Sequence, residues 1–153
     1  MENVNKKQRK SKGFTLVELL IVIIIIGILA GMMLLSTGSA TDKAKATQIV
    51  SNMRNIKSAA LMYYADEGKW PTAGTTALDS ISKYLDSSPD KTVYSIVAGT
   101  GSGDLSVEAN VTDTGVQSKL GTMGKDAGLY SDKGAKTVYT GGSPVYMPIR
   151  KTN

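Results

Sequence analysis

The stretch that decides the fold is Gly13-Phe14-Thr15-Leu16-Val17-Glu18, which joins a basic leader (residues 1–13) to an apolar run. The run continues from Leu19 to Leu35 as LLIVIIIIGILAGMMLL, and Glu18 is the only charged residue among the twenty from Leu16 onward. Twenty residues of α-helix rise about 30 Å, the thickness of the hydrocarbon core of a bilayer. The run therefore predicts a membrane-spanning helix with one carboxylate inside it.

The net charge of +5 is concentrated ahead of this run. The leader holds five of the 18 basic residues and one of the 13 acidic residues, which leaves thirteen basic and twelve acidic side chains in the rest of the chain. Positive charge before an apolar segment indicates that the leader stays in the cytoplasm and that the chain after Leu35 is exported. Because no cluster of Lys and Arg remains to bind phosphates, we expect no nucleic-acid site.

The chain contains no cysteine and no histidine. This composition excludes disulfides, thiolate metal sites and a Ser-His triad, so we expect neither an enzyme nor a bound cofactor. Asp126 and Asp132 lie among Gly-rich loops and are weak candidates for calcium ligands, because calcium prefers oxygen donors. Their spacing fits no EF-hand loop, and we therefore assign no metal site.

Gly13, Phe14 and Glu18 resemble the class III signal of type IV pilins and of the pseudopilins of type II secretion and competence systems. In that family a basic leader ends in glycine, phenylalanine follows, and a glutamate stands four residues further on. The resemblance implies that a prepilin peptidase cleaves between Gly13 and Phe14 and methylates the new amine of Phe14. It also implies a homopolymer held by its N-terminal helices, together with an inner-membrane assembly platform as a partner.

Two interpretations of Glu18 are open. The first is a capping box, in which Thr15 and Glu18 satisfy each other's backbone donors at the helix start. The second comes from the resemblance: Glu18 pairs with the cationic N-terminus of a neighbouring Phe14 and sets the axial register of the filament. We favour the pairing, because an anion in an apolar bundle gains more from a cation than from a cap. The two can coexist.

Three glycines mark the packing and flexibility of this helix. Gly27 and Gly31 form a GxxxG spacing, which lets another helix approach closely, although glycine is also simply tolerated in membrane helices. Many pilins carry a proline where this chain has Leu35. Any local flexibility must therefore come from these glycines and from the Ser/Thr/Gly cluster that contains Gly38.

Beyond residue 40 the pattern changes to that of a water-facing amphipathic helix. Gly68 and Pro71 predict its end near Glu67, so that one helix runs from residue 14 to about residue 67. Its apolar positions follow helical spacing and should pack on a domain. They are Ile49, Met53, Ile56, Ala60 and Tyr64.

The remaining residues predict an α+β domain. A short helix is expected at 76–86, with Thr75 or Thr76 as its cap. Strands are expected at 92–98, 105–111, 136–140 and 145–149. The long helix would pack on a small antiparallel sheet, as in the pilin fold that the resemblance implies. We divide the chain into the leader 1–13, the apolar helix 14–40 and a globular domain 41–153.

These features predict a structural subunit of a type IV pilus, serving adhesion, motility or DNA uptake. Before assembly it would be a single-pass protein of the cytoplasmic membrane with its N-terminus inside, and after assembly part of an extracellular filament. The first alternative is the major pseudopilin of a type II secretion system. The alternative from another class is a monomeric, membrane-anchored extracytoplasmic binding domain.

Overall fold

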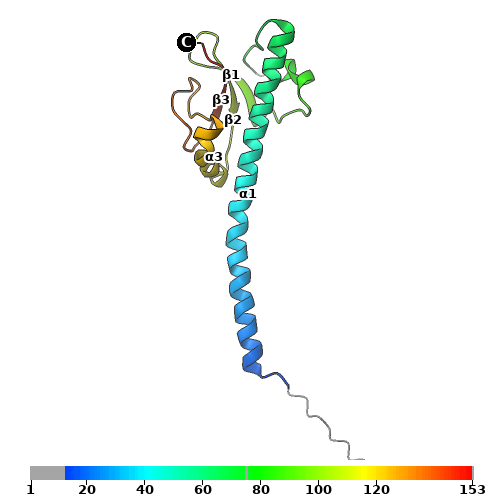
Figure 1. The fold of residues 1–153 in the computed structure, drawn as a ribbon, viewed down its shortest axis with the longest axis vertical. Helices are drawn as coiled ribbons and strands as arrows, with labels where there is room; N and C mark the ends of the chain where they lie inside the picture. Colours follow the sequence, from blue (N-terminus) through cyan, green and yellow to red (C-terminus); the bar gives the residue numbers. More distant parts are fainter. Residues whose placement is uncertain (1–12, 75, 153) are drawn as a thin grey trace, which may run out of the picture. The chain divides into compact units, whose positions relative to one another are not determined.

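The computed structural model describes residues 13–74 and 76–152, with the backbone alone for residues 34–37. Most of the leader and the predicted cap Thr75 lie outside the described residues. The chain divides into two compact units, with the boundary between Gly38 and Ser39. Along the chain the elements are α1 (Leu16–Glu67), α2 (Ala77–Ser80), the 3₁₀ helix η1 (Ser82–Tyr84), β1 (Tyr94–Ala98), β2 (Leu105–Ala109), α3 (Thr114–Ala127) and β3 (Val145–Arg150) (Figure 1).

The long helix α1 ends where the sequence predicts. Gly68 adopts a left-handed φ of 68°, and its N–H donates to the carbonyl of Tyr64 at 2.9 Å. Glycine takes this conformation without a Cβ penalty, which closes the last turn and turns the chain away from the helix axis. The predicted helix boundary near Glu67 is confirmed.

The sheet is antiparallel with the order β1–β2–β3, and the α+β fold class is confirmed. Ile96 pairs with Val107, and Val107 pairs with Met147, so one face of the sheet carries apolar side chains from all three strands. The hairpin between β1 and β2 closes with the Gly99 N–H donating to the carbonyl of Asp104 at 2.9 Å. The strands predicted at 92–98, 105–111 and 145–149 are therefore present, with small shifts at their ends.

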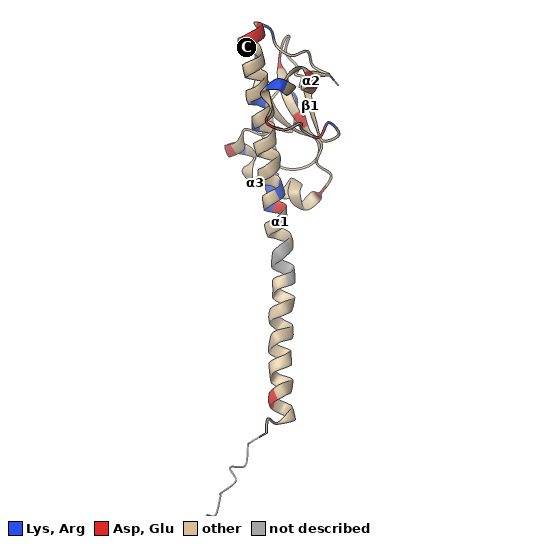
Figure 2. Cartoon of the chain, turned by 90° about the vertical axis from the view of Figure 1, so that its right-hand side faces the viewer, with Lys and Arg blue, Asp and Glu red and all other residues tan. Residues whose placement is uncertain are grey.

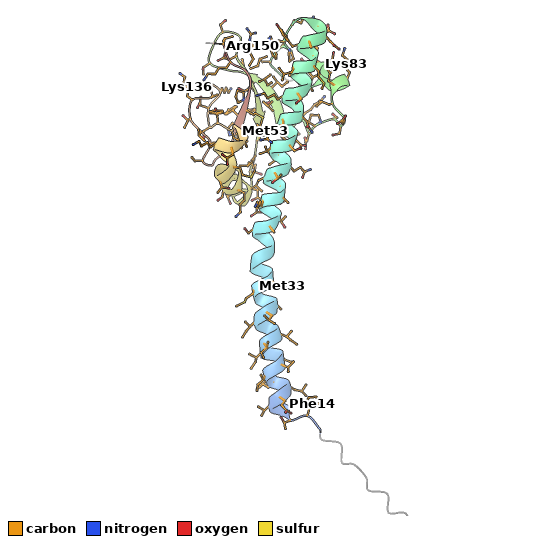
Figure 3. All side chains as sticks on the ribbon, viewed as in Figure 1. Phe14, Met33, Met53, Lys83, Lys136 and Arg150 are labelled. Atoms are coloured by element: carbon orange, nitrogen blue, oxygen red, sulfur yellow. The ribbon has the colours of Figure 1, made fainter. Side chains whose placement is uncertain are left out.

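The second half of α1 supplies one side of the core, and Met53 points from it into the domain in Figure 3. Met53 is fully buried, in one apolar cluster with Ile96 and Val107 of the sheet. The predicted helix face needs one correction, because Tyr64 is 42% exposed whereas Tyr63 is half-buried against the core. Tyr63 packs edge-on against Tyr84 of η1 at 6.3 Å between ring centroids, whereas Tyr64 stacks on Trp70 at 4.3 Å.

The helix predicted at 76–86 is interrupted. The structure has four residues of α-helix in α2, followed by η1, and Thr76 makes no side-chain cap. The Ser80 hydroxyl donates back to the carbonyl of Thr76 at 3.2 Å, a bond of the kind that competes with regular helix. Leu78 and Ile81 are nevertheless buried as their spacing predicts.

Helix α3 was not predicted, because its glycines suggested loops. Asp113 caps its N-terminus by accepting hydrogen bonds from the N–H groups of Gly115 and Val116 at 3.0 and 3.3 Å. Gly128 ends it with a left-handed φ of 68°. Val116 and Leu120 are buried four residues apart, which is a helical signal that was present in the sequence.

Two glycines inside α3 serve close packing. A Cβ at Gly121 or Gly124 would collide with the backbone carbonyl of Thr140 or Tyr139, respectively. The strand prediction for 136–140 is wrong. The backbone of this segment packs against α3 at Tyr139 and Thr140, and its bridge to Tyr130 is limited to Val138. Beside β3, the position of a fourth strand is taken by Tyr130.

Asp104 holds the C-terminal end of the chain to the hairpin. It is 7% exposed, and its carboxylate accepts the Thr152 N–H and hydroxyl at 2.7 Å each and the Gly101 N–H at 3.0 Å. These hydrogen bonds, chiefly that from the Thr152 N–H, lower the pKa of Asp104. The ionised form is therefore favoured in the folded chain.

We expect Gly124→Ala to lower the free energy of unfolding by roughly 1–3 kcal/mol, because the new methyl group must displace the backbone at Tyr139. Urea unfolding of a fragment that begins at Ser39 would measure it, since the core lies entirely between Ala46 and Ile149. Ser118→Ala, at an exposed position of α3, is the control and should change stability by less than about 0.5 kcal/mol. Stabilisation by Gly124→Ala, as helix propensity alone would give, would contradict this packing.

The stabilising effect of Asp104 should be lost in acid. Because its pKa is lower in the folded than in the unfolded chain, its contribution is present above the unfolded pKa of about 3.9 and disappears as the pH falls through the folded pKa. Thermal unfolding of the wild type and of Asp104→Asn should therefore show a Tm difference at pH 7 that shrinks below pH ~4. A difference that stays constant down to pH ~3 would show that the charge plays no part.

Candidate assembly site at the start of the long helix

The first turn of α1 is closed by reciprocal hydrogen bonds between Thr15 and Glu18. The Thr15 N–H and hydroxyl both donate to Glu18 Oε2, at 2.8 and 2.9 Å, and the Glu18 N–H donates to Thr15 Oγ1 at 3.2 Å. The Thr15 carbonyl accepts the first helical bond, from the Leu19 N–H. The structure thus contains the capping box that the sequence predicts.

The capping hydrogen bonds use only one of the two carboxylate oxygens of Glu18. Both donors from Thr15 go to Oε2, and within the described residues Oε1 has no hydrogen-bond partner. Glu18 is exposed, as are all residues from Gly13 to Met33. A carboxylate with one uncommitted oxygen can accept a cation from another molecule while it keeps the cap. The pairing with a neighbouring Phe14 therefore remains a prediction compatible with this geometry.

The Gly13–Phe14 bond lies outside the helix and is open. Phe14 is 85% exposed and lies just before the start of α1 in Figure 3, and a Cβ added at Gly13 would meet nothing within 4 Å. A peptidase needs such an extended, uncovered backbone around the bond that it cleaves. The geometry is compatible with the predicted processing.

In the part of the chain that the structure describes, nothing covers the apolar side chains between Leu16 and Met33. Those of large residues from Leu16 to Met33 are 47% to 80% exposed. An 18-residue window here has a mean hydropathy of 3.0 with none of it buried, so the helix is long and apolar enough to cross a membrane. In Figure 2 the stretch from Leu16 to Met33 carries one charged position, the red turn at Glu18 near the start of α1. A patch of this size marks an interaction with lipid or protein.

The three glycines assigned to helix packing all lie within α1. A Cβ at Gly27, Gly31 or Gly38 would meet no atom within 4 Å. Packing within the chain therefore does not require glycine at these positions. Gly27 and Gly31 lie one turn apart on one helix face, as a close helix–helix contact requires.

The structure does not gather the calcium candidates into a site. Asp126 is an exposed residue of α3, whereas Asp132 accepts backbone N–H groups of its own loop from Gly134, Lys136 and Thr137. These bonds, led by that from Thr137, lower the pKa of Asp132 and shape the loop. Among the described residues, no group of three or more acidic side chains could hold a metal ion.

Comparison with known families gives two matches. Residues 8–34 match the profile described as the prokaryotic N-terminal methylation motif, which contains Gly13, Phe14 and Glu18. Residues 40–95 match the profile described as PilW, C-terminal. The first match covers the apolar unit, and the second covers the amphipathic half of α1 and the segment that leads to β1.

Known relatives include filament proteins and a secretion protein. The chain is 33% identical over 118 residues to the fimbrial protein EcpC of Eikenella corrodens, covering 77% of this chain and 72% of that protein. It is 44% identical over 66 residues to the type IV major pilin protein PilE1 of Neisseria gonorrhoeae, which is 43% of this chain and 40% of the pilin. It is 36% identical over 66 residues to the type II secretion system core protein G of Klebsiella michiganensis, which is 43% of this chain and 46% of that protein.

The fold has a solved counterpart. The structure of the major type IV pilin PilA1 from Clostridium difficile aligns with a TM-score of 0.51 and 22% sequence identity, covering 72% of this chain and 98% of that one. At this identity the likeness establishes the fold. The match to PilE1 spans about two fifths of that pilin's length, so the globular parts of the two proteins are not equated.

Proposed function

Because the chain belongs to the type IV pilin and pseudopilin family, we propose that it is a structural subunit of a type IV pilus. The similarity to EcpC, over 72% of that fimbrial protein, supports a filament role beyond the shared N-terminal helix. We assign the chain a structural role and no catalytic one. Adhesion, motility or DNA uptake would then be properties of the assembled filament.

The observation that carries the proposal is the uncovered apolar helix. Apolar surface in water costs about 25 cal/mol per Å², so the side chains from Leu16 to Met33 need a cover in every state of the protein. Lipid supplies it before assembly, when the subunit spans the cytoplasmic membrane with the basic leader inside. The same helices of neighbouring copies supply it in the filament.

Cleavage of the leader would come before the transfer of the apolar helix from lipid into the filament. Removal of the leader by a prepilin peptidase leaves Phe14 with a free, N-methylated amine, which is a cation at neutral pH. In a growing filament this cation would meet the uncommitted oxygen of Glu18 on the adjacent copy. An inner-membrane assembly platform would be the partner that moves processed subunits out of the lipid.

A pseudopilin of type II secretion is the second candidate, supported by the 36% identity to core protein G. The two candidates share the helix and its processing and differ in the length of the polymer. Electron microscopy of cells with and without the gene would separate them: long surface filaments lost on deletion favour the pilus. Loss of a secreted protein without loss of filaments favours the pseudopilin.

Gly13→Val should block processing, because a β-branched residue hinders access to the bond before Phe14. We expect the full-length precursor to accumulate in the membrane and surface filaments to be absent. Immunoblotting of membrane and sheared-filament fractions measures both, with Ser11→Val in the same leader as the control. Mature-size protein and normal filaments from Gly13→Val would reject the assigned cleavage site.

Glu18→Ala tests pairing against capping. Pairing predicts normal processing with at least about tenfold fewer filaments, because the cation of the next copy then lies in an apolar bundle without an anion. Thr15→Val is the control, since it removes the hydroxyl of the capping box but keeps the carboxylate. If Thr15→Val reduced filaments as strongly as Glu18→Ala, the cap and not the pairing would be the important contact.

A further inference from the structure

The globular domain carries one asparagine in the acceptor sequence for N-linked glycans. Of the five asparagines that are followed by two or more residues, only Asn110 has a serine or threonine two positions later, in Asn110-Val111-Thr112. The sequence Asn-x-Ser/Thr, with x other than proline, marks such an acceptor on the surface of exported proteins. Because a motif of three residues is short, its place in the fold decides whether it can act.

The backbone at this motif is extended and presents both polar side chains to solvent. Residues 110–113 join β2 to α3 without a turn, and the Asn110 N–H donates to the Val93 carbonyl at 2.8 Å, which continues the pairing of β1 with β2. Asn110 and Thr112 are exposed, whereas Val111 between them is buried. Successive side chains of an extended segment point to opposite faces. The carboxamide and the hydroxyl therefore lie together on the outer side of the chain.

The fold does not use either of these polar side chains. In the part of the chain that the structure describes, the Asn110 carboxamide and the Thr112 hydroxyl have no hydrogen-bond partner. The segment is instead held by its backbone and by Val111, whose N–H donates to Ser143 Oγ at 3.1 Å. The next residue, Asp113, caps α3. The motif is thus fixed in place while its two reactive groups stay available to an enzyme.

Open space adjoins the motif. Asn110 and Thr112 line a hollow of about 330 Å³, whose other wall includes Lys45 and Ile49 of α1. Lys45 also pairs with Asp113 at 3.5 Å, and in Figure 1 α3 lies beside the cyan part of α1. A glycan attached to Asn110 can therefore extend from the domain without displacing a core side chain.

The motif also lies close to the proposed membrane span in the sequence of α1. Lys45, across the hollow from Asn110, is separated from Leu35, the last residue of the predicted span, by residues 36–44. A chain of about ten residues reaches at most about 36 Å in any conformation. In the anchored precursor the motif would stay within reach of a membrane-bound transferase whose glycan donor is a lipid.

We propose that Asn110 is glycosylated on the exported side of the membrane, with a polyprenyl-diphosphate-linked glycan as the donor. This inference rests on the proposed export of the domain. The Asn110 amide nitrogen attacks the anomeric carbon of the first sugar, and the bond from that carbon to the diphosphate oxygen breaks. The lipid diphosphate leaves with the electron pair, and a base of the transferase takes the amide proton. An N-glycosidic bond forms, and no oxidant or reductant is needed.

Mass spectrometry of the subunit from cells that make it naturally tests the proposal. Trypsin cuts after Lys91 and Lys119, and the peptide between them contains Asn110 as its one asparagine. We expect this peptide to carry the mass of one or more sugars, with fragment ions that place the addition on Asn110. A peptide without this addition in the wild type would overturn the proposal.

Substitutions separate this modification from a glycan on a hydroxyl group. Asn110→Gln and Thr112→Val should each abolish the added mass, whereas Thr112→Ser should keep it, because serine also supplies the hydroxyl that the acceptor sequence requires. Asn55→Gln, at an exposed position of α1 outside any such motif, is the control and should keep the added mass. An added mass that persists in Asn110→Gln would show a serine or threonine as the acceptor and would reject Asn110.

A topology measurement distinguishes failure of this inference from failure of the proposed function. Because the chain has no cysteine, Lys125→Cys introduces a single thiol at an exposed position of α3. A membrane-impermeant maleimide should label this variant in intact spheroplasts. If the thiol is labelled and the Asn110 peptide is unmodified, the domain is exported and the glycosylation is wrong. If the thiol is not labelled, the proposed function fails, and this inference fails with it.

Discussion

The apolar side chains between Leu16 and Met33 must be covered by something outside the chain, and the arrangement of the rest of the molecule depends on this requirement. Within the described residues none of these side chains is buried, and Glu18 is the one charge among them. In lipid the backbone of such a segment is satisfied only as a helix, so the same residues that demand a cover also fix the structure. Glu18 fits this setting because it stands in the first turn, where Thr15 donates to one carboxylate oxygen and leaves the other uncommitted.

The second half of the same helix has the opposite character. From Ala46 to Ala60 its apolar residues form one stripe in the core with the sheet, while Leu61, Met62 and Tyr64 near its end are exposed. Close backbone packing completes the domain at Gly121 and Gly124, where α3 leaves no room for a Cβ against Tyr139 and Thr140. Helix α1 thus joins an apolar segment, which needs lipid or neighbouring copies around it, to a domain that has its own core. The subunit can therefore fold before it assembles.

The sequence predicted those elements that have either a clear boundary residue, such as glycine or proline, or a clear apolar/polar periodicity. Gly68 and Pro71 fixed the end of α1, and the alternation in Leu105–Ala109 marked β2. Predictions from the sequence were wrong where packing against another segment of the same chain decides the local structure. The glycines of α3 suggested a loop, although a neighbouring backbone requires them, and residues 136–140 have strand-like composition, but Tyr130 takes the place beside β3. The residues of the candidate assembly site, Gly13, Phe14 and Glu18, were predicted from their order and spacing in the sequence alone.

We propose that this chain becomes a filament subunit by losing its leader and exposing a charged amine at Phe14. Mass spectrometry of the N-terminal peptide from purified surface filaments tests it most directly. We expect a peptide that begins at Phe14 and carries one methyl group on its amine. Filaments whose subunit begins at Met1, or at a residue beyond the apolar helix, would contradict it.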